Sequence, residues 1–287
     1  MEPAAYLPLL AIAIFAALFA VEKLFPLRTT RSALFGRLVI NLAVAGLAYL
    51  TAMIVVRPSA LHTLDWTAQN SFGLIQLMPA PDWAQFIVGF LLLDLSFYYW
   101  HVLNHKIPVL WRFHNVHHID PDLDVSTAFR FHFGEVLLST LFRVAQVSLI
   151  GMSFITFAVY EGVFQAGTLF HHSNVRLPIR LERLLNKVLV TPRMHGIHHS
   201  QVQYETNSNF GVVFSWWDKL HRTIGLNIPQ SRIEIGIAGY SMPEDNRLWH
   251  ALALPFRKQR DYWRKPDGTI PERDVAVVQD ARTYLAE

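Results

Sequence analysis

Long apolar stretches alternate with polar segments over the first part of the chain. Residues 3–21 and 38–56 contain no charged side chain, and each matches the ~20 residues that cross a bilayer core. A third stretch, 83–100, is interrupted only by Asp94. No basic residues precede the first stretch and no small-residue cleavage site follows it, so we expect a retained helix there and not a signal peptide.

A fourth apolar stretch, 136–170, carries Arg143 and Glu161 and is too long for one crossing. The residues LIGMS at 149–153 divide it, which predicts a tight hairpin of two helices. The expected fold is all-α and integral to the membrane, with about four transmembrane helices (two spans plus re-entrant or hairpin helices) and a helical, histidine-rich cytoplasmic cap.

Basic residues in the loops predict the orientation. The segment 22–37 carries four of them, whereas 57–82 carries only Arg57. Because cytoplasmic loops are enriched in lysine and arginine, we expect the first loop in the cytoplasm and the second outside. The third helix then returns to the cytoplasm near His101.

The chain becomes polar after residue 172. Residues 177–190 have apolar positions at helical spacing with basic residues between them, as in a helix that lies on a membrane surface. The basic segment 256–265 indicates either a solvated charged helix or a surface contact. We expect N-terminal transmembrane helices over 1–83, a dinuclear metal domain over 84–226 and a C-terminal cytoplasmic tail over 227–287.

The amino-acid composition excludes several classes of function. The chain is 52% hydrophobic and only 16% charged, with a net charge of +3 and no block of basic residues, so a nucleic-acid surface is not expected. Cysteine is absent, which excludes disulfides, iron–sulfur clusters and thiolate-ligated metal from this chain.

Histidines are concentrated in one part of the sequence. HVLNH at 101–105 places two histidines four residues apart on one helix face, and the spacing H-x-x-H-H occurs at 114–118 and at 195–199. In H-x-x-H-H, the first and third histidines share a face while the middle one is rotated by about 100°. Each motif can therefore serve one metal with two ligands and a neighbouring metal with the third. The eight candidates are His101, His105, His114, His117, His118, His195, His198 and His199.

Further polar residues lie at positions that could support such a site. His132 and His172 are additional candidate ligands, and Asp94, Glu135 and Glu161 are candidate acceptors for the second N–H of a metal-bound histidine. Asp94 and Glu161 have an alternative interpretation as buried carboxylates bonded to a neighbouring helix or to Arg143. Four histidines are expected to play other roles: His62, His171, His221 and His250.

All-nitrogen sites suit iron, zinc, copper and nickel. The chain has neither an H-E-x-x-H motif nor a G-x-S-x-G motif, so zinc hydrolysis is not specifically indicated. A histidine-rich dinuclear site at a membrane surface favours iron that activates O₂ against a lipid C–H bond.

With these residues in place, the sequence resembles the fatty acid hydroxylase superfamily, also called the sterol desaturase family. The resemblance extends from about 84 to 226. It is carried by HVLNH, LWRFHNVHHIDPDLDVSTAFRFHFGE, HHSN, TPRMHGIHHS and NFGVVFSWWDKLHRT, in family order. Phe133 departs from the family, which often has proline after the histidine that matches His132.

The resemblance implies a bacterial-type, membrane-bound di-iron oxidoreductase with O₂ as co-substrate, acting on lipid as hydroxylase, desaturase or ether-cleaving monooxygenase. The implied ligands are the eight histidines together with His172 and His132. Electrons would come from an external ferredoxin or cytochrome b5-like donor. Its docking cations, or alternatively anchors to lipid headgroups, are Arg112, Arg193, Lys219 and Arg222.

Two alternatives from other classes stay open. One is a metal transporter, although transport favours ionisable residues spread through several spans. The other is a lipid-binding membrane protein with a non-catalytic zinc pair, and zinc is also expected to replace iron in some purified preparations.

Overall fold

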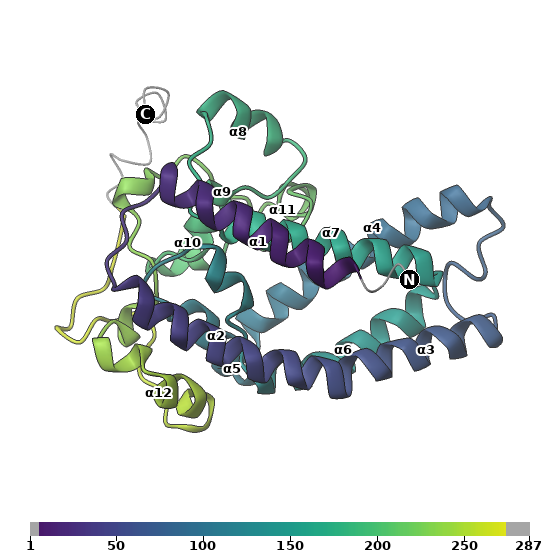
Figure 1. The fold of residues 1–287 in the computed structure, drawn as a ribbon, viewed down its shortest axis with the longest axis horizontal. Helices are drawn as coiled ribbons and strands as arrows, with labels where there is room; N and C mark the ends of the chain where they lie inside the picture. Colours follow the sequence, from purple (N-terminus) through teal and green to yellow (C-terminus); the bar gives the residue numbers. More distant parts are fainter. Residues whose placement is uncertain (1–5, 274–287) are drawn as a thin grey trace.

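In a computed structural model that describes residues 6–273, the chain is all-helical, with isolated β-bridges in place of strands over that range (Figure 1). The long helices extend to one side of a cap built from short helices and loops (Figure 1). The helices are α1 (Tyr6–Leu24), α2 (Leu34–Thr51), α3 (Arg57–Gln69), α4 (Asp82–Lys106), α5 (Pro108–His118), α6 (Phe133–Ile150), α7 (Phe154–His172), α8 (Ile179–Leu185), α9 (Pro192–His198), α10 (Gln203–Thr206), α11 (Trp216–His221) and α12 (Leu248–Ala253).

Three helices are long and apolar enough to cross a membrane, namely Leu34–Gln69, α4 and α6. Large apolar side chains such as Leu42, Ile54 and Leu141 are exposed along them, as expected of surfaces that face lipid. The apolar stretches 38–56 and 83–100 and the first part of 136–170 therefore lie in these three helices.

The expected loop over 57–82 is wrong in its first half. The helix that begins at Leu34 continues through a π-helical turn, Ala52–Val56, into α3, and the loop is confined to 70–81. Pro58 has no N–H to donate to the preceding turn, and it directly follows the π-helical turn, where the regular α-helical hydrogen-bond pattern is already interrupted. The small residues Ala60 and Thr63 are buried and α3 packs against α6, so tertiary packing stabilises a helix whose sequence is only weakly apolar.

The predicted hairpin within 136–170 is confirmed as α6 and α7, which meet at residues 151–153. Gly151 ends α6 with φ of 66°, and its Cα lies against Gly73 of the loop after α3. A Cβ on Gly151 would lie 2.4 Å from the Phe72 carbonyl oxygen, so only glycine allows this contact. Ser153 then caps α7 by accepting a hydrogen bond from the Thr156 N–H.

The cap contains the polar second half of the chain. Within 177–190 the helix is limited to α8, where Leu181 and Leu184 stay exposed. The segment 257–265 is not helical, and Tyr262 and Trp263 instead pack on a core that joins α2 and α5 to α12. Residues 274–287 of the expected tail lie outside the described residues.

Candidate metal centre

The cap and the ends of two long helices bring nine histidines together in two adjacent groups. Within each group one ring nitrogen of every member lies within 4.8 Å of the others. The five-histidine group comprises His101, His105, His114, His118 and His198, and the four-histidine group comprises His117, His172, His195 and His199.

Both H-x-x-H-H motifs are divided between the groups. On α5, His114 and His118 belong to the five-histidine group and the middle residue, His117, belongs to the other. On α9 the division is reversed, because the middle residue His198 belongs to the five-histidine group. This is the separation of faces that helical spacing predicts. Each motif thus contributes to both groups.

In the four-histidine group the ring nitrogens converge closely. The Nε2 atom of His172 lies 3.0 Å from the Nε2 atoms of both His117 and His195, and the Nε2 atoms of His195 and His199 are 3.1 Å apart. Two nitrogens bound at right angles to one ion at about 2.1 Å would be about 3.0 Å apart. The spacing therefore fits a shared cation that receives a lone pair from each ring.

The opposite ring nitrogens of several histidines are held by hydrogen bonds. Nδ1 donates to the Phe210 carbonyl from His101 (2.8 Å), to the Ser208 carbonyl from His198 (2.7 Å) and to the Thr168 carbonyl from His172 (2.8 Å). A ring that donates from Nδ1 keeps the lone pair on Nε2. The Nε2 atoms of His101 and His198 are buried and have no hydrogen-bond partner among the described residues. These are the features of imidazoles oriented for metal binding.

One carboxylate takes the same role. Glu135, at the start of α6, lies with Oε1 2.8 Å from Nδ1 of His114. This contact would orient the His114 ring, and the role of Glu135 in a metal site stays a prediction.

Burial keeps the clustered rings neutral. It lowers the pKa of His117, His118, His195, His198 and His199 well below the usual histidine value, and the neighbouring imidazoles lower it further. Neutral imidazole is the form that binds a metal. The donor set therefore fits a pair of transition-metal ions.

His132 lies outside both groups. Its Nδ1 accepts a hydrogen bond from the Gly134 N–H at 2.9 Å, which caps α6, and its Nε2 lies 3.1 Å from the Leu252 carbonyl. Both ring nitrogens therefore already have partners. His171 also lies outside both groups, although its ring centroid is only 4.2 Å from that of His195.

The other isolated histidines belong to neither group. His62 is exposed on α3, His221 bonds Tyr99 and the Trp217 carbonyl, and His250 faces Asp245.

Asp94 and Glu161 bond groups other than histidine. Asp94 accepts hydrogen bonds from the Trp217 indole (2.7 Å), the Tyr160 hydroxyl and two backbone N–H groups of the segment 213–214. Glu161 pairs with Arg143 at 2.9 Å. Both residues therefore match the alternative interpretation: Asp94 bonds a neighbouring element and Glu161 bonds Arg143. Asp94 secures the segment that follows Phe210 against α4.

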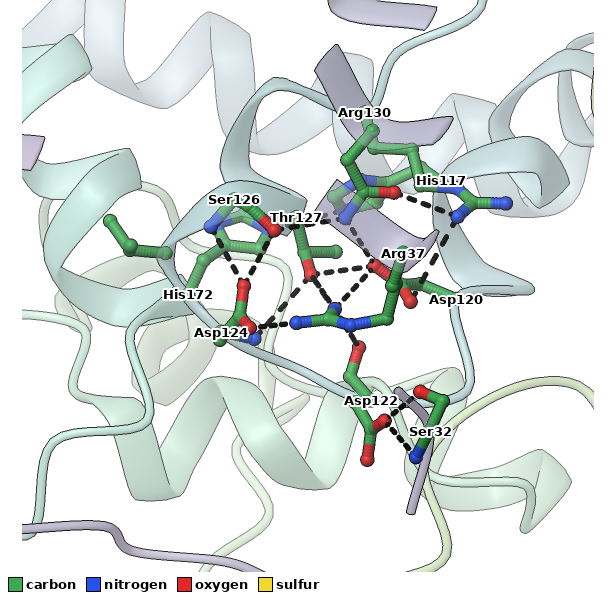
Figure 2. A network of polar contacts seen from close by, with 12 residues as sticks. Ser32, Arg37, His117, Asp120, Asp122, Asp124, Ser126, Thr127, Arg130 and His172 are labelled. Atoms are coloured by element: carbon green, nitrogen blue, oxygen red, sulfur yellow. Dashed lines mark hydrogen bonds and ion pairs between the residues drawn. The ribbon is translucent and has the colours of Figure 1, made fainter. Parts of the chain in front are cut away.

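A buried polar network lies beside the HNVHH motif (Figure 2) and was not predicted from the sequence. Asp120 Oδ2 accepts hydrogen bonds from Asn41 (2.9 Å) and Thr127 (2.8 Å) and pairs with Arg37. Arg130 donates to the carbonyl of Val116, inside the motif, at 2.9 Å. The available signal was the alternation of aspartates at 120, 122 and 124 directly after the motif.

The same network includes the N-terminal helices. Glu22 of α1 accepts hydrogen bonds from the backbone N–H groups of Val125 and Asn174, and Asp122 accepts from those of Arg31 and Ser32. Helix α1 and the loop between α1 and α2 are thereby bonded to the segments that follow His118 and His172.

The four expected docking cations differ in their surroundings. Arg193 is half-buried and pairs with Glu182 at 2.7 Å, and Lys219 donates to the carbonyls of Asn186 and Lys187. Arg112 and Arg222 are exposed. Among the four, Arg112 and Arg222 are the ones with an exposed guanidinium group that forms no ion pair within the described part of the chain.

Comparison with known proteins gives an independent result. Residues 86–223 match the family model described as fatty acid hydroxylase. An ornithine lipid hydroxylase of Rhizobium tropici is 32% identical over 200 residues, which cover 67% of this chain and 57% of that protein. A cholesterol 25-hydroxylase of Mus musculus is 29% identical over 171 residues, covering 58% of this chain and 54% of that protein.

A third relative, the alkylglycerol monooxygenase of Homo sapiens, is 30% identical over 138 residues, which cover 47% of this chain and 29% of that protein. The matched region therefore spans between about a third and just over half of the length of these relatives. No solved structure matches the chain significantly.

Proposed function

Because this chain belongs to the fatty acid hydroxylase superfamily, we propose that it is a membrane-bound, O₂-dependent di-iron oxidoreductase that oxidises a C–H bond of a lipid. The observation that supports the proposal most strongly is the division of nine histidines into two adjacent groups whose lone pairs converge. Nine imidazoles exceed the number of ligands that one ion binds, whereas two ions could bind all nine.

In this proposal the five-histidine group holds one ion and the four-histidine group holds the other. Bound iron would supply the activation of O₂. The protein's part is to keep the rings neutral by burial and to orient them through the Phe210, Ser208 and Thr168 carbonyls and through Glu135. His132 is left out of the proposed ligand set, because both of its ring nitrogens are engaged elsewhere.

The reaction class we propose is hydroxylation. The relatives are named hydroxylases of ornithine lipid and cholesterol and a monooxygenase of alkylglycerol. The balance is one C–H bond, one O₂, two electrons and two protons giving one alcohol and one water. The chain contains no cysteine and hence no iron–sulfur cluster of its own, so an external ferredoxin or cytochrome b5-like protein would supply the electrons.

We also propose that the histidine groups lie on the cytoplasmic side of a bacterial inner membrane. Arg28, Arg31 and Arg37 lie between α1 and α2 or at the start of α2, next to the cap, and this segment is the most basic of the inter-helix loops. The cap would then face the compartment where soluble electron donors reside.

The test is metal analysis of protein purified from iron-supplied cells, followed by turnover with reductant, O₂ and a membrane lipid extract. The expected result is two iron ions per chain and a lipid product heavier by one oxygen atom that derives from ¹⁸O₂. Two zinc ions, together with no labelled product after the apoprotein is reloaded with Fe(II), would contradict the proposal and favour the non-catalytic zinc pair.

A further inference from the structure

A cavity of about 450 Å³ opens to solvent beside the five-histidine group. We call it the α4–α5 pocket, because it lies where α4 ends and α5 begins. The residues of its wall that carry the argument are His105, Lys106, Trp111, Arg112, Tyr262 and Trp263. Only His105 among them belongs to the proposed metal centre.

The charges around the α4–α5 pocket have one sign. Lys106 and Arg112 line it, and none of the lining residues is acidic. Arg112 forms no ion pair with any residue in 6–273, and Lys106 donates only to an amide oxygen, that of Asn207, at 3.2 Å. Two cations without a counter-ion at the rim of a concave site would attract an anion.

One residue of the pocket wall, Trp111, has an unsatisfied hydrogen-bond donor. Trp111 is only 5% exposed, and its indole Nε1 has no hydrogen-bond partner among the described residues. A buried N–H without an acceptor destabilises the folded chain. The two cations at the rim, and not this buried N–H, are the groups that an anion in the pocket would meet.

Aromatic rings connect the pocket to the histidines. The Trp111 ring stacks on that of Trp263 at 6.0 Å with an interplanar angle of 22°, and its other neighbours include the His105 ring at 4.8 Å and the His118 ring at 5.3 Å. A group bound on this wall therefore lies beside the five-histidine group. The aromatic surface suits the apolar part of a ligand whose polar part meets the cations.

The position of the pocket indicates where such a ligand comes from. Lys106 is the last residue of α4, one of the helices able to cross a membrane. Next to it Leu103, Ile107 and Val109 expose 41%, 37% and 55% of their surface. Cations beside exposed apolar side chains at the end of a spanning helix are typical of the membrane–water interface. A molecule with an apolar body and an anionic head is the ligand available at that depth.

We propose that the α4–α5 pocket binds the anionic headgroup, a phosphate or carboxylate, of the lipid substrate. The inference rests on the proposed function only in calling the bound lipid the substrate, because binding of the headgroup can be measured without turnover. It assigns specificity to Lys106 and Arg112, which lie outside both histidine groups, and it predicts a preference for charged over neutral lipids.

The experiment compares two probes with the same acyl chains, phosphatidic acid and diacylglycerol, binding to the metal-loaded protein in detergent as followed by native mass spectrometry. We expect phosphatidic acid to bind at least about tenfold more tightly, and the double variant Lys106→Gln/Arg112→Gln to lose that preference. Lys106→Arg/Arg112→Lys should retain it. Arg183→Gln, an exposed cation on α8 outside the pocket, is the matched control and should bind like the wild type.

Metal content is measured in every variant, and an unchanged value shows that the fold and the metal centre are intact. Equal binding of the two lipids by the wild type, or an unchanged preference in the double variant, would overturn the proposal. Inorganic phosphate that competes as strongly as phosphatidic acid would identify a site for a free anion and would overturn the lipid assignment. Because none of these readings involves O₂ consumption, they stand even if the protein proves inactive as an oxidase.

Discussion

Arg37 Nη1 lies 2.9 Å from Asp120 Oδ2, and neither side chain is more than 2% exposed. Arg37 belongs to the first turn of α2, whereas Asp120 follows the HNVHH motif by two residues. Burial alone would raise the pKa of Asp120, but Arg37 and Arg130 hold it below its usual value. The pair thus fixes the end of α5, and with it His117 and His118, to the start of a long apolar helix.

Replacement of Arg37 by methionine should destabilise the protein by about 3–5 kcal/mol, because Asp120 and Asp124 would lose their main buried counter-ion. The measurement is the thermal unfolding midpoint of purified protein in detergent. The exposed pair of Arg31 with Glu234 provides the control. Arg31→Met should cost no more than about 1 kcal/mol. Equal effects of the two substitutions would refute the role assigned to the buried pair.

Replacement of His117 by alanine should reduce the metal content from two ions per chain towards one and abolish lipid oxidation. The four-histidine group would lose a quarter of its donors, and His117 Nε2 contacts His172 Nε2 directly. Metal analysis of the purified variant tests this. His62→Ala is the control and should keep both ions and activity.

Replacement of His132 by alanine separates a structural role from a ligand role. Because this ring caps α6 and bonds the Leu252 carbonyl, the substitution should lower stability by about 1 kcal/mol while the metal content stays at two. Loss of one ion in the His132 variant, with the fold retained, would show that it is a ligand after all.

Replacement of Glu135 by alanine should weaken metal binding about 10–100-fold, because the His114 ring would lose the acceptor that orients it. Titration of the apoprotein with metal measures the effect. Glu135→Gln keeps an acceptor oxygen and should restore most of the affinity. A variant with glutamine as weak as the one with alanine would indicate that charge, and not orientation, is what Glu135 contributes.

Replacement of Asp94 by alanine should destabilise the protein by about 2 kcal/mol or more, since the Trp217 indole and two backbone N–H groups would be left without an acceptor. Asp82→Asn, at the exposed start of α4, should have little effect. Thermal unfolding of both variants checks the comparison. If Asp94→Ala lowered metal content without lowering stability, Asp94 would act on the metal centre and not on the loop.

Acidification should destabilise the metal-free protein. The clustered histidines outside the long apolar helices have pKa values far below the usual 6.5, so the unfolded chain binds more protons than the folded one once the pH falls below about 6.5. This contribution to stability is therefore fully present above that pH and is lost progressively as the pH falls from about 6.5 towards the lowered pKa values of the folded state. Unfolding midpoints of the apoprotein at pH 8 and pH 5.5 measure the loss, and equal midpoints would contradict it.

The long apolar helices, the hairpin near 149–153 and the division of each H-x-x-H-H motif into two faces could be predicted from the sequence. These properties are local, because hydrophobic length sets a span and the 3.6-residue period sets a face. For the same reason His114, His117 and His118 could be separated before any fold was known.

The contacts between residues far apart in the sequence could not be predicted in this way. The carbonyls of Phe210 and Ser208 hold histidines on other elements, but backbone groups leave no trace in a sequence. The continuation of α2 into α3 depends on packing against α6, which outweighs weak local propensity. The α4–α5 pocket likewise exists only because Tyr262 and Trp263, from the far end of the chain, fold back over Trp111. Burial and convergence are properties of chain folding in three dimensions, and no local pattern encodes them.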